Sequence, residues 1–286
     1  MNMLALLMIL ASAVSHATWN FLAKRTHGGA PFVWLTDVLS VLFYAPLVGI
    51  LFMVQRWSLS LAGIMLMVGS AVLHLAYFLL LQRGYRMGDL SLVYPLTRGT
   101  GPLLSTLGPI VLLGEWPTPI ALAGMLLVVV GLFLLTGGLC IFRANTGHLV
   151  LRYGTLTGLF IACYTLWDKQ AVSGAHVSPL LYNYGVILVR GMLLSPYALR
   201  HWHMVRQDWH EHRLEVCGVA VLSFLAYFLV LTALVFTPVS YIAPVREIGV
   251  LFGTILGIRL LAEREARRRL IAAGMIVVGI IVLAFS

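Results

Sequence analysis

The sequence predicts an all-α integral membrane protein with ten transmembrane helices, arranged as two inverted five-helix repeats. Three observations predict this fold class. Of the 286 residues, 60% are hydrophobic and only 10% are charged, whereas about 25% are charged in an ordinary soluble domain. Apolar stretches of about 20 residues, long enough to cross a bilayer as a helix, recur along the whole chain. The second half of the chain also repeats motifs of the first half.

Hydropathy and turn residues delimit the ten expected helices in chain order. They cover residues 2–22, 33–54, 61–81, 92–113, 118–138, 151–169, 178–198, 215–235, 239–261 and 267–285. Segments of this length satisfy their backbone hydrogen bonds internally in lipid only as helices, because a spanning strand shows alternation over about 10 residues. The short connections leave no room for a soluble domain.

The connections differ sharply in positive charge. If they are numbered one to nine, the odd connections hold fourteen Lys and Arg residues, and the even connections hold only Arg56 and Lys169. Cytoplasmic loops carry the excess of Lys and Arg, so we expect the odd loops in the cytoplasm and both termini outside the inner (plasma) membrane. The same excess of Lys and Arg accounts for the net charge of +9, because these residues are expected beside anionic lipid headgroups. We therefore expect no nucleic-acid partner.

The two halves match at offsets of about 148 to 150 residues. The matches are Ala76-Tyr77-Phe78-Leu79 with Ala226-Tyr227-Phe228-Leu229, Ala123-Gly124-Met125 with Ala273-Gly274-Met275, Pro46 with Pro196, Ser91 and Pro95 with Ser240 and Pro244, and His16, Trp19 and Asn20 with Tyr164, Trp167 and Asp168. We place the repeats at residues 1–139 and 140–286. Because each has five spans, the second inserts upside down, as in secondary transporters. Gly124 and Gly274 are expected to allow close helix packing.

The first apolar segment ends near Ala11-Ser12-Ala13, a small-residue run typical of a signal-peptide cleavage site. No positive region precedes it, and it has a counterpart in the second half, so we interpret it as a retained first span.

Short motifs after the fourth and ninth helices link the chain to a family. Leu113-Gly114-Glu115 follows the fourth helix and Leu261-Ala262-Glu263 follows the ninth, and both helices contain proline. With the 5+5 repeat, the whole chain resembles the drug/metabolite transporter (DMT) superfamily, EamA type. The resemblance implies a secondary transporter without a cofactor. Members export amino acids and other metabolites, or move nucleotide sugars, drugs and lipid-linked sugars. Members usually have a cytoplasmic N-terminus, whereas the charge count here predicts the opposite.

Polar side chains inside the expected helices fall at two depths. The first layer, about 10 Å below the odd-loop surface, comprises His16, Asn20, His74 and Arg98. The second layer, below the opposite surface, comprises Tyr164, Asp168, Tyr227 and Arg246. Two polar layers separated by an apolar zone predict two gates around a central cavity, and Tyr77, Tyr94 and Tyr241 are further lining candidates.

Charges inside a span are costly, at about 2.5–3.5 kcal/mol each near a helix centre on insertion scales. We therefore expect Arg98 and Arg246 to bind an anionic substrate group, carboxylate or phosphate. The alternative is a structural ion pair between Arg98 and Glu247. Arg190 is a weaker candidate, because its counterpart is Ser40.

Four residues could couple transport to protons. His16 and His74 titrate near neutral pH in ordinary surroundings, and Glu247 and Asp37 would do so if burial raised their pKa. The alternative is that each forms a hydrogen bond between helices.

The most favoured function is export of a small metabolite, either an amino acid or another carboxylate-bearing, phosphate-bearing or amphipathic solute. The mechanism expected is alternating access between the repeats. The alternatives are a flippase for lipid-linked sugars or lipids, a drug exporter and, more distantly, an integral-membrane enzyme. The chain has no HExxH, GxSxG or carboxylate-rich motif, so no catalytic residue is proposed.

Neither metal nor disulfide chemistry is expected. The pairs His201/His203 and His210/His212 lie in a basic segment that is better explained as an interfacial amphipathic helix anchored by Trp202 and Trp209. The three cysteines, Cys140, Cys163 and Cys217, have no CxxC spacing. The expected partners are a small-molecule substrate, the lipid bilayer and candidate coupling protons. A functional monomer is expected, with a dimer as the alternative.

Overall fold

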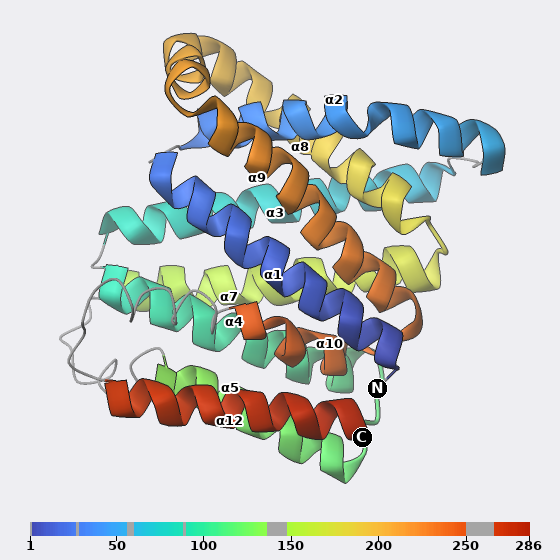
Figure 1. Ribbon diagram of the computed structural model, residues 1–286, viewed down its shortest axis with the longest axis vertical. Coiled ribbons are helices and arrows are strands. Elements are labelled where there is room, and N and C mark those ends of the chain that lie inside the picture. Colours follow the sequence, from blue (N-terminus) through green and yellow to red (C-terminus); the bar gives the residue numbers. More distant parts are fainter. Residues whose placement is uncertain (1, 27–28, 56–59, 88–89, 136–147, 250–265) are drawn as a thin grey trace. The chain divides into compact units, whose positions relative to one another are not determined.

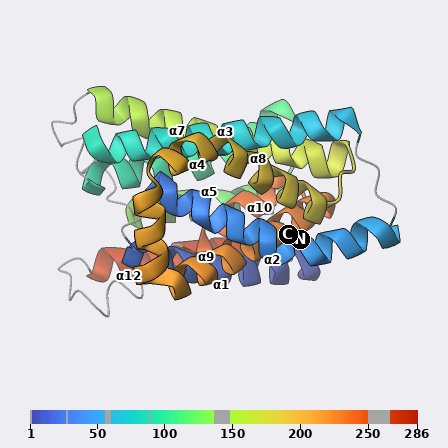
Figure 2. The same cartoon turned by 90° about the horizontal axis from the view of Figure 1, so that it is seen from above.

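The computed structural model describes residues 2–26, 29–55, 60–87, 90–135, 148–249 and 266–286. Side chains are described for these residues except at positions 24, 84–87, 90–99, 148–151 and 266–269. Within these ranges the chain forms α-helices and one π-helical turn, without a strand (Figures 1 and 2). The predicted all-α fold with ten helices is confirmed.

The helices follow the apolar stretches of the sequence. They are α1 (Met3–Thr26), α2 (Ala30–Gln55), α3 (Leu61–Met87), α4 (Leu90–Leu112), α5 (Pro119–Leu135), α7 (His148–Lys169), the π-helix η1 (Gln170–Gly174), α8 (Pro179–Arg200), α9 (Trp202–Phe236), α10 (Val239–Arg246) and α12 (Ala266–Phe285).

Four helical segments are long and apolar enough to cross a membrane: Met3–Ala23, Ala30–Gln55, Leu61–Arg83 and Trp202–Phe236. Shorter apolar helices cover Thr100–Leu112, Pro119–Leu135 and Leu270–Phe285. Large apolar side chains on these helices, such as Met53, Val111 and Leu126, are exposed. A surface of this kind is stable against lipid hydrocarbon and not against water.

Several helix boundaries differ from those expected. α1 ends at Thr26 rather than at residue 22, and α10 ends at Arg246, within the expected helix 239–261. α3 continues to Met87 rather than ending at residue 81, and α9 begins at Trp202 rather than at residue 215. Within α9, His212 has non-helical backbone angles (φ −133°, ψ 29°), so a kink separates the basic segment 202–211 from the apolar segment after it. The expected helix 239–261 is described only as far as residue 249, and the remainder lies outside the described residues.

The chain divides into two compact units, and each contains segments from both halves of the sequence. Unit 1 comprises Met1–Leu10, Leu73–Trp167 and Phe236–Ser286. Unit 2 comprises Ala11–Val72 and Asp168–Val235.

In unit 1, α5 packs along α12, and α10 packs against α4 (Figure 1). The α5–α12 contact depends on glycine. A Cβ atom at Gly124 would lie 2.9 Å from the Gly279 carbonyl oxygen, and one at Gly131 would lie 2.9 Å from the Ala272 carbonyl oxygen. At Gly274, by contrast, no atom of the described residues lies within 4 Å of such a Cβ. The prediction of close packing is therefore wrong for Gly274: its helix does make a close contact, but through the face that carries Gly279.

In unit 2, α2 packs along α8. A buried apolar cluster joins these two helices to both sides of the α9 kink, and its members are Phe32, Leu35, Ala198, Val205, Val216 and Val219. Trp34 of α2 donates a hydrogen bond from Nε1 to the Ser195 hydroxyl (2.9 Å) and lies edge-on to Trp202. The basic segment of α9 is therefore packed against α2 through its apolar side chains.

Candidate functional site

Unit 1 contains an aromatic–arginine cluster made of His74, Tyr77, Tyr164 and Arg246. The Tyr164 side chain is buried, and its ring stacks on the His74 ring with 4.1 Å between centroids. Tyr77 meets the same ring edge-on at 5.8 Å. Arg246 donates from Nη2 to the Tyr164 hydroxyl at 3.4 Å. Three helices, α3, α7 and α10, thus bring four of the predicted site residues together.

This cluster corrects the predicted division into two layers. His74 was placed in one layer and Tyr164 and Arg246 in the other, but the structure puts them in contact. The depth of His74 was counted from an expected helix end at residue 81, and α3 continues to Met87. Six additional residues correspond to about 9 Å of helix, which is enough to remove the separation.

The position of α10, which carries Arg246, is fixed by the Leu113-Gly114-Glu115 motif. Gly114 has φ +64°, a conformation that glycine adopts without strain. The turn directs the Glu115 carboxylate to the start of α10, where Oε1 and Oε2 accept hydrogen bonds from the backbone N–H groups of Val239 and Ser240 (both 2.9 Å). A carboxylate at this position satisfies donors that have no partner within the helix and complements the helix dipole.

From the sequence alone this motif indicates the family and no structural role. Its looser counterpart, Leu261-Ala262-Glu263, lies outside the described residues.

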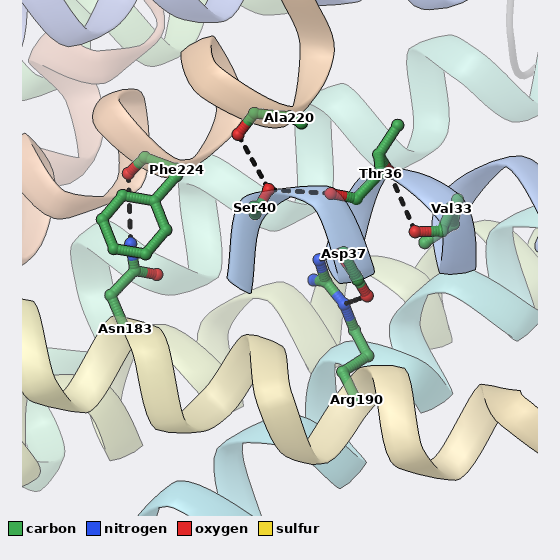
Figure 3. A network of polar contacts seen from close by, with 8 residues as sticks. All are labelled: Val33, Thr36, Asp37, Ser40, Asn183, Arg190, Ala220 and Phe224. Atoms are coloured by element: carbon green, nitrogen blue, oxygen red, sulfur yellow. Dashed lines mark hydrogen bonds and ion pairs between the residues drawn. The ribbon is translucent and has the colours of Figure 1, made fainter. Parts of the chain in front are cut away.

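In unit 2, Asp37 of α2 and Arg190 of α8 form a two-point ion pair (Figure 3). Arg190 Nε donates to Oδ2 at 2.8 Å, and Nη2 donates to Oδ1 at 2.5 Å. Asp37 is 3% exposed. This pairing was not predicted. Opposite charges on the second helix of each repeat could have indicated it, because equivalent helices of inverted repeats often meet.

Nearby polar groups tie α9 to the same two helices (Figure 3). Ser40 of α2 donates to the Ala220 carbonyl (2.8 Å), and Asn183 of α8 donates to the Phe224 carbonyl (3.1 Å). Together with the ion pair, these bonds form a polar seam through unit 2.

Asp168 lies at the centre of a second polar group in unit 2. It is fully buried in the last turn of α7. Its carboxylate accepts hydrogen bonds from the hydroxyls of Tyr182 (2.7 Å) and Tyr227. Asp168 and Tyr227 were predicted site residues, whereas Tyr182 was missed, because the residue 150 positions earlier is the apolar Phe32.

A π-helical turn, η1, begins two residues after Asp168. Lys169 Nζ and the Ser173 hydroxyl both donate to the Leu234 carbonyl at 2.7 Å, near the C-terminal end of α9, where carbonyl groups have no helical partner and a cation is favoured. The turn ends at Gly174, and His176, in the connection to α8, has φ 52°. π-helical turns of this kind are frequent at functional sites.

The remaining predicted residues are placed as follows. His16 contacts the Trp19 ring edge-on at 4.9 Å, and the Asn20 side chain donates to the His16 carbonyl of its own helix. Glu247 is buried and follows α10 directly, and Tyr241 is half-buried in α10. The side chains of Tyr94 and Arg98 lie outside the described residues. Within the described part of the chain, no group of three His, Cys, Asp or Glu residues is arranged to hold a metal ion.

Comparison with known proteins identifies the family. The model of the EamA-like transporter family matches the chain twice, over residues 3–137 and 149–285. The chain belongs to the EamA-like transporter family. The two matches agree with the 5+5 arrangement of helices and make the protein a membrane transporter of the DMT type.

One solved structure, described only as "Crystal structure of protein", has 16% sequence identity to this chain. The match covers 98% of each chain with a TM-score of 0.69, which supports the fold alone. No curated protein matches the sequence.

Proposed function

We propose that this EamA-like protein exports a small metabolite carrying a carboxylate or phosphate group, such as an amino acid, by alternating access between its repeats. The observation that carries the proposal is the aromatic–arginine cluster of His74, Tyr77, Tyr164 and Arg246 in unit 1. We further propose that it acts as a monomer in the inner membrane, with the odd-numbered loops in the cytoplasm.

Arg246 has the chemistry of an anion-binding residue. Its guanidinium is always charged and can bind a carboxylate or phosphate through two parallel N–H groups. The bond to the neutral Tyr164 hydroxyl is long, at 3.4 Å, so an anionic oxygen would be a stronger acceptor for the same N–H group. A charge kept inside a membrane protein at this energetic cost is typically functional.

The rings around Arg246 suit the rest of an amphipathic solute. Tyr164, His74 and Tyr77 present apolar faces with polar edges, and such rings bind small molecules by stacking while their hydroxyls set orientation. Arg98, on the fourth helix, stays a candidate second anion-binding residue. The capping of α10 by Glu115 holds Arg246 on a short helix of fixed direction, as a binding site requires.

Thermal unfolding of the purified protein with a panel of solutes tests the proposal. The panel comprises neutral and acidic amino acids, monocarboxylates, phosphate esters, cationic drugs and lipid-linked sugars. A ligand present at 100 times its Kd adds about 2.7 kcal/mol to the stability of a protein that binds it only when folded. We expect carboxylates or phosphates to stabilise the protein, and Arg246→Gln to abolish the effect.

The matched control is Arg206→Gln, because Arg206 is exposed in the basic segment of α9. This variant should keep the response. Stabilisation by cationic drugs or lipid-linked sugars alone would instead favour a drug exporter or a flippase and refute the anionic substrate.

A further inference from the structure

We propose that Asp168 is the proton-binding residue that couples transport to the proton gradient. This inference rests on the proposed transport function, and it changes the expected coupling site from His16, His74, Asp37 or Glu247 to a carboxyl group in unit 2.

The first argument is the position of the carboxyl group. Asp168 is fully buried in a segment that lies within the membrane protein. A carboxylate without water is stable only when several donors surround it. Tyr182 of α8 and Tyr227 of α9 supply two hydroxyl donors.

The second argument is that these partners can serve both protonation states. A phenol hydroxyl donates and accepts hydrogen bonds, whereas a guanidinium only donates. The partner of Asp37 is the guanidinium of Arg190, which binds both carboxylate oxygens. Protonation of Asp37 would set an O–H group against N–H donors, so that pair is suited to one charge state. The phenol partners of Asp168 suit both of its charge states.

The rearrangement on protonation can be followed atom by atom. The Tyr182 hydroxyl has two acceptors within reach, Asp168 Oδ1 at 2.7 Å and the Leu66 carbonyl at 3.3 Å. When Oδ1 gains a proton, its new O–H group donates to the Tyr182 oxygen, and the Tyr182 hydrogen turns to the Leu66 carbonyl. Oδ2 continues to accept from Tyr227. One proton is taken up, and no covalent bond other than the new O–H bond forms or breaks.

The charged and titratable groups around Asp168 come from each neighbouring element. They include Lys169 on its own helix, Tyr182 on α8 and Tyr227 on α9, and the Ser70 hydroxyl of α3 bonds to Tyr182. The same unit also holds the Asp37–Arg190 ion pair of α2 and α8. A change of charge at Asp168 therefore alters bonds of α3, α7, α8 and α9.

The adjoining π-helical turn connects this change of charge to the contact between α7 and α9. Lys169 and Ser173 hold the end of α7 and the turn to the Leu234 carbonyl of α9. Single π-helical turns are rare and occur frequently at functional sites. Protonation two residues before this turn would act on the end of α7 beside its contacts with α9 within unit 2.

Infrared difference spectroscopy between pH 5 and pH 9 tests proton binding directly, with the proton alone as ligand. We expect the C=O band of a protonated carboxylic acid to appear at low pH in the wild-type protein and to be lost in Asp168→Asn. Asp208→Asn, which removes a carboxyl from the basic segment of α9, is the control and should keep the band. A band that persists in Asp168→Asn, or is absent from the wild type, overturns the proposal.

Tyr182→Phe provides a second variant in case Asp168→Asn does not fold. We expect it to keep the band and to move it to higher frequency, because the protonated carboxyl loses its hydrogen-bond acceptor. An unmoved band counts against the arrangement.

Coupling is measured in proteoliposomes with labelled L-alanine and L-glutamate as probes. Asp168→Asn should lose accumulation driven by a pH gradient, whereas the control Asp208→Asn should keep both exchange of the transported probe at equal pH and gradient-driven accumulation. Retained gradient-driven accumulation in Asp168→Asn overturns the coupling role. If the wild type moves neither probe nor any panel solute, the proposed function fails, while the infrared result still decides whether Asp168 binds a proton.

Discussion

Arg190 and Arg246 both belong to the second sequence repeat and both lie within helices, yet they are held in opposite ways. In unit 2, Arg190 makes two short bonds to the buried Asp37. In unit 1, Arg246 donates a long hydrogen bond to the hydroxyl of Tyr164, which is itself stacked on His74. The first arginine is bound to the other repeat, because Asp37 lies on α2. The second contacts a neutral phenol of its own repeat.

This difference separates a structural arginine from a candidate binding arginine. A guanidinium whose fork is occupied by a carboxylate has its strongest anion-binding geometry in use. A phenol hydroxyl is a weaker acceptor than a substrate carboxylate or phosphate, which would replace it at the same N–H group. The residue type alone, or its depth in the membrane, therefore does not assign a role; the partner does.

The largest effect is expected from Arg190→Met. Removing one partner of a buried ion pair costs about 3–5 kcal/mol, because the other charge stays buried without compensation. We expect thermal unfolding in detergent at a markedly lower temperature than in the wild type. The double variant Asp37→Leu/Arg190→Met should recover much of the loss, because an apolar pair of similar size leaves no buried charge. If the double variant is no more stable than Arg190→Met, the cost does not come from the orphaned carboxylate.

The ion pair also marks where sequence reasoning was limited. The apolar stretches and the repeat predicted the helices, because hydropathy and helix length are local properties of the chain. Asp37 and Arg190 are separated by more than 150 residues, and each was considered separately. Only the contact of α2 with α8 explains why Asp37, near a helix end, and Arg190, without a charged counterpart in the first repeat, are both present.

The second effect concerns the close packing of α5 on α12 in unit 1. Gly131→Ala would bring a methyl group within 2.9 Å of the Ala272 carbonyl oxygen and 2.8 Å of Ile276. Overpacking of this kind costs about 1–3 kcal/mol. Gly274→Ala is the matched control on α12, since no described atom lies within 4 Å of the new methyl group. Equal thermal stability of the two variants would contradict close packing of α5 on α12.

A third, smaller effect is expected from Glu115→Ala. Loss of a helix cap costs about 0.5–2 kcal/mol, and here two backbone donors of α10 lose their acceptor. Because α10 carries Arg246, we also expect weaker ligand-induced stabilisation by carboxylates. Glu115→Gln retains one acceptor oxygen and should fall between Glu115→Ala and the wild type. Unchanged unfolding in Glu115→Ala would mean that the motif does not stabilise α10.

The sequence pointed to residues of the candidate site better than to their arrangement in space. His74, Tyr77, Tyr164 and Arg246 were all chosen as polar groups inside apolar helices, and the structure brings them together. Their distribution over two layers was wrong, since depth depends on helix ends that hydropathy does not locate. Tyr182 gave no signal, because a tyrosine in the first turn of a membrane helix ordinarily indicates an interfacial position.

The smallest effect on the free protein is expected from Arg246→Gln. This variant decides whether Arg246 and Arg190 have different roles. A long hydrogen bond to a neutral hydroxyl contributes about 0.5–1.5 kcal/mol, so we expect unfolding without ligand to change less than in Arg190→Met. The same variant should lose the stabilisation by carboxylate or phosphate ligands, which Arg206→Gln retains. Arg190→Met should show the reverse order, with a large loss of intrinsic stability. A residue that binds substrate and that the fold does not require affects stability mainly when its ligand is present. If Arg246→Gln instead destabilises the free protein as strongly as Arg190→Met does, both arginines serve the fold.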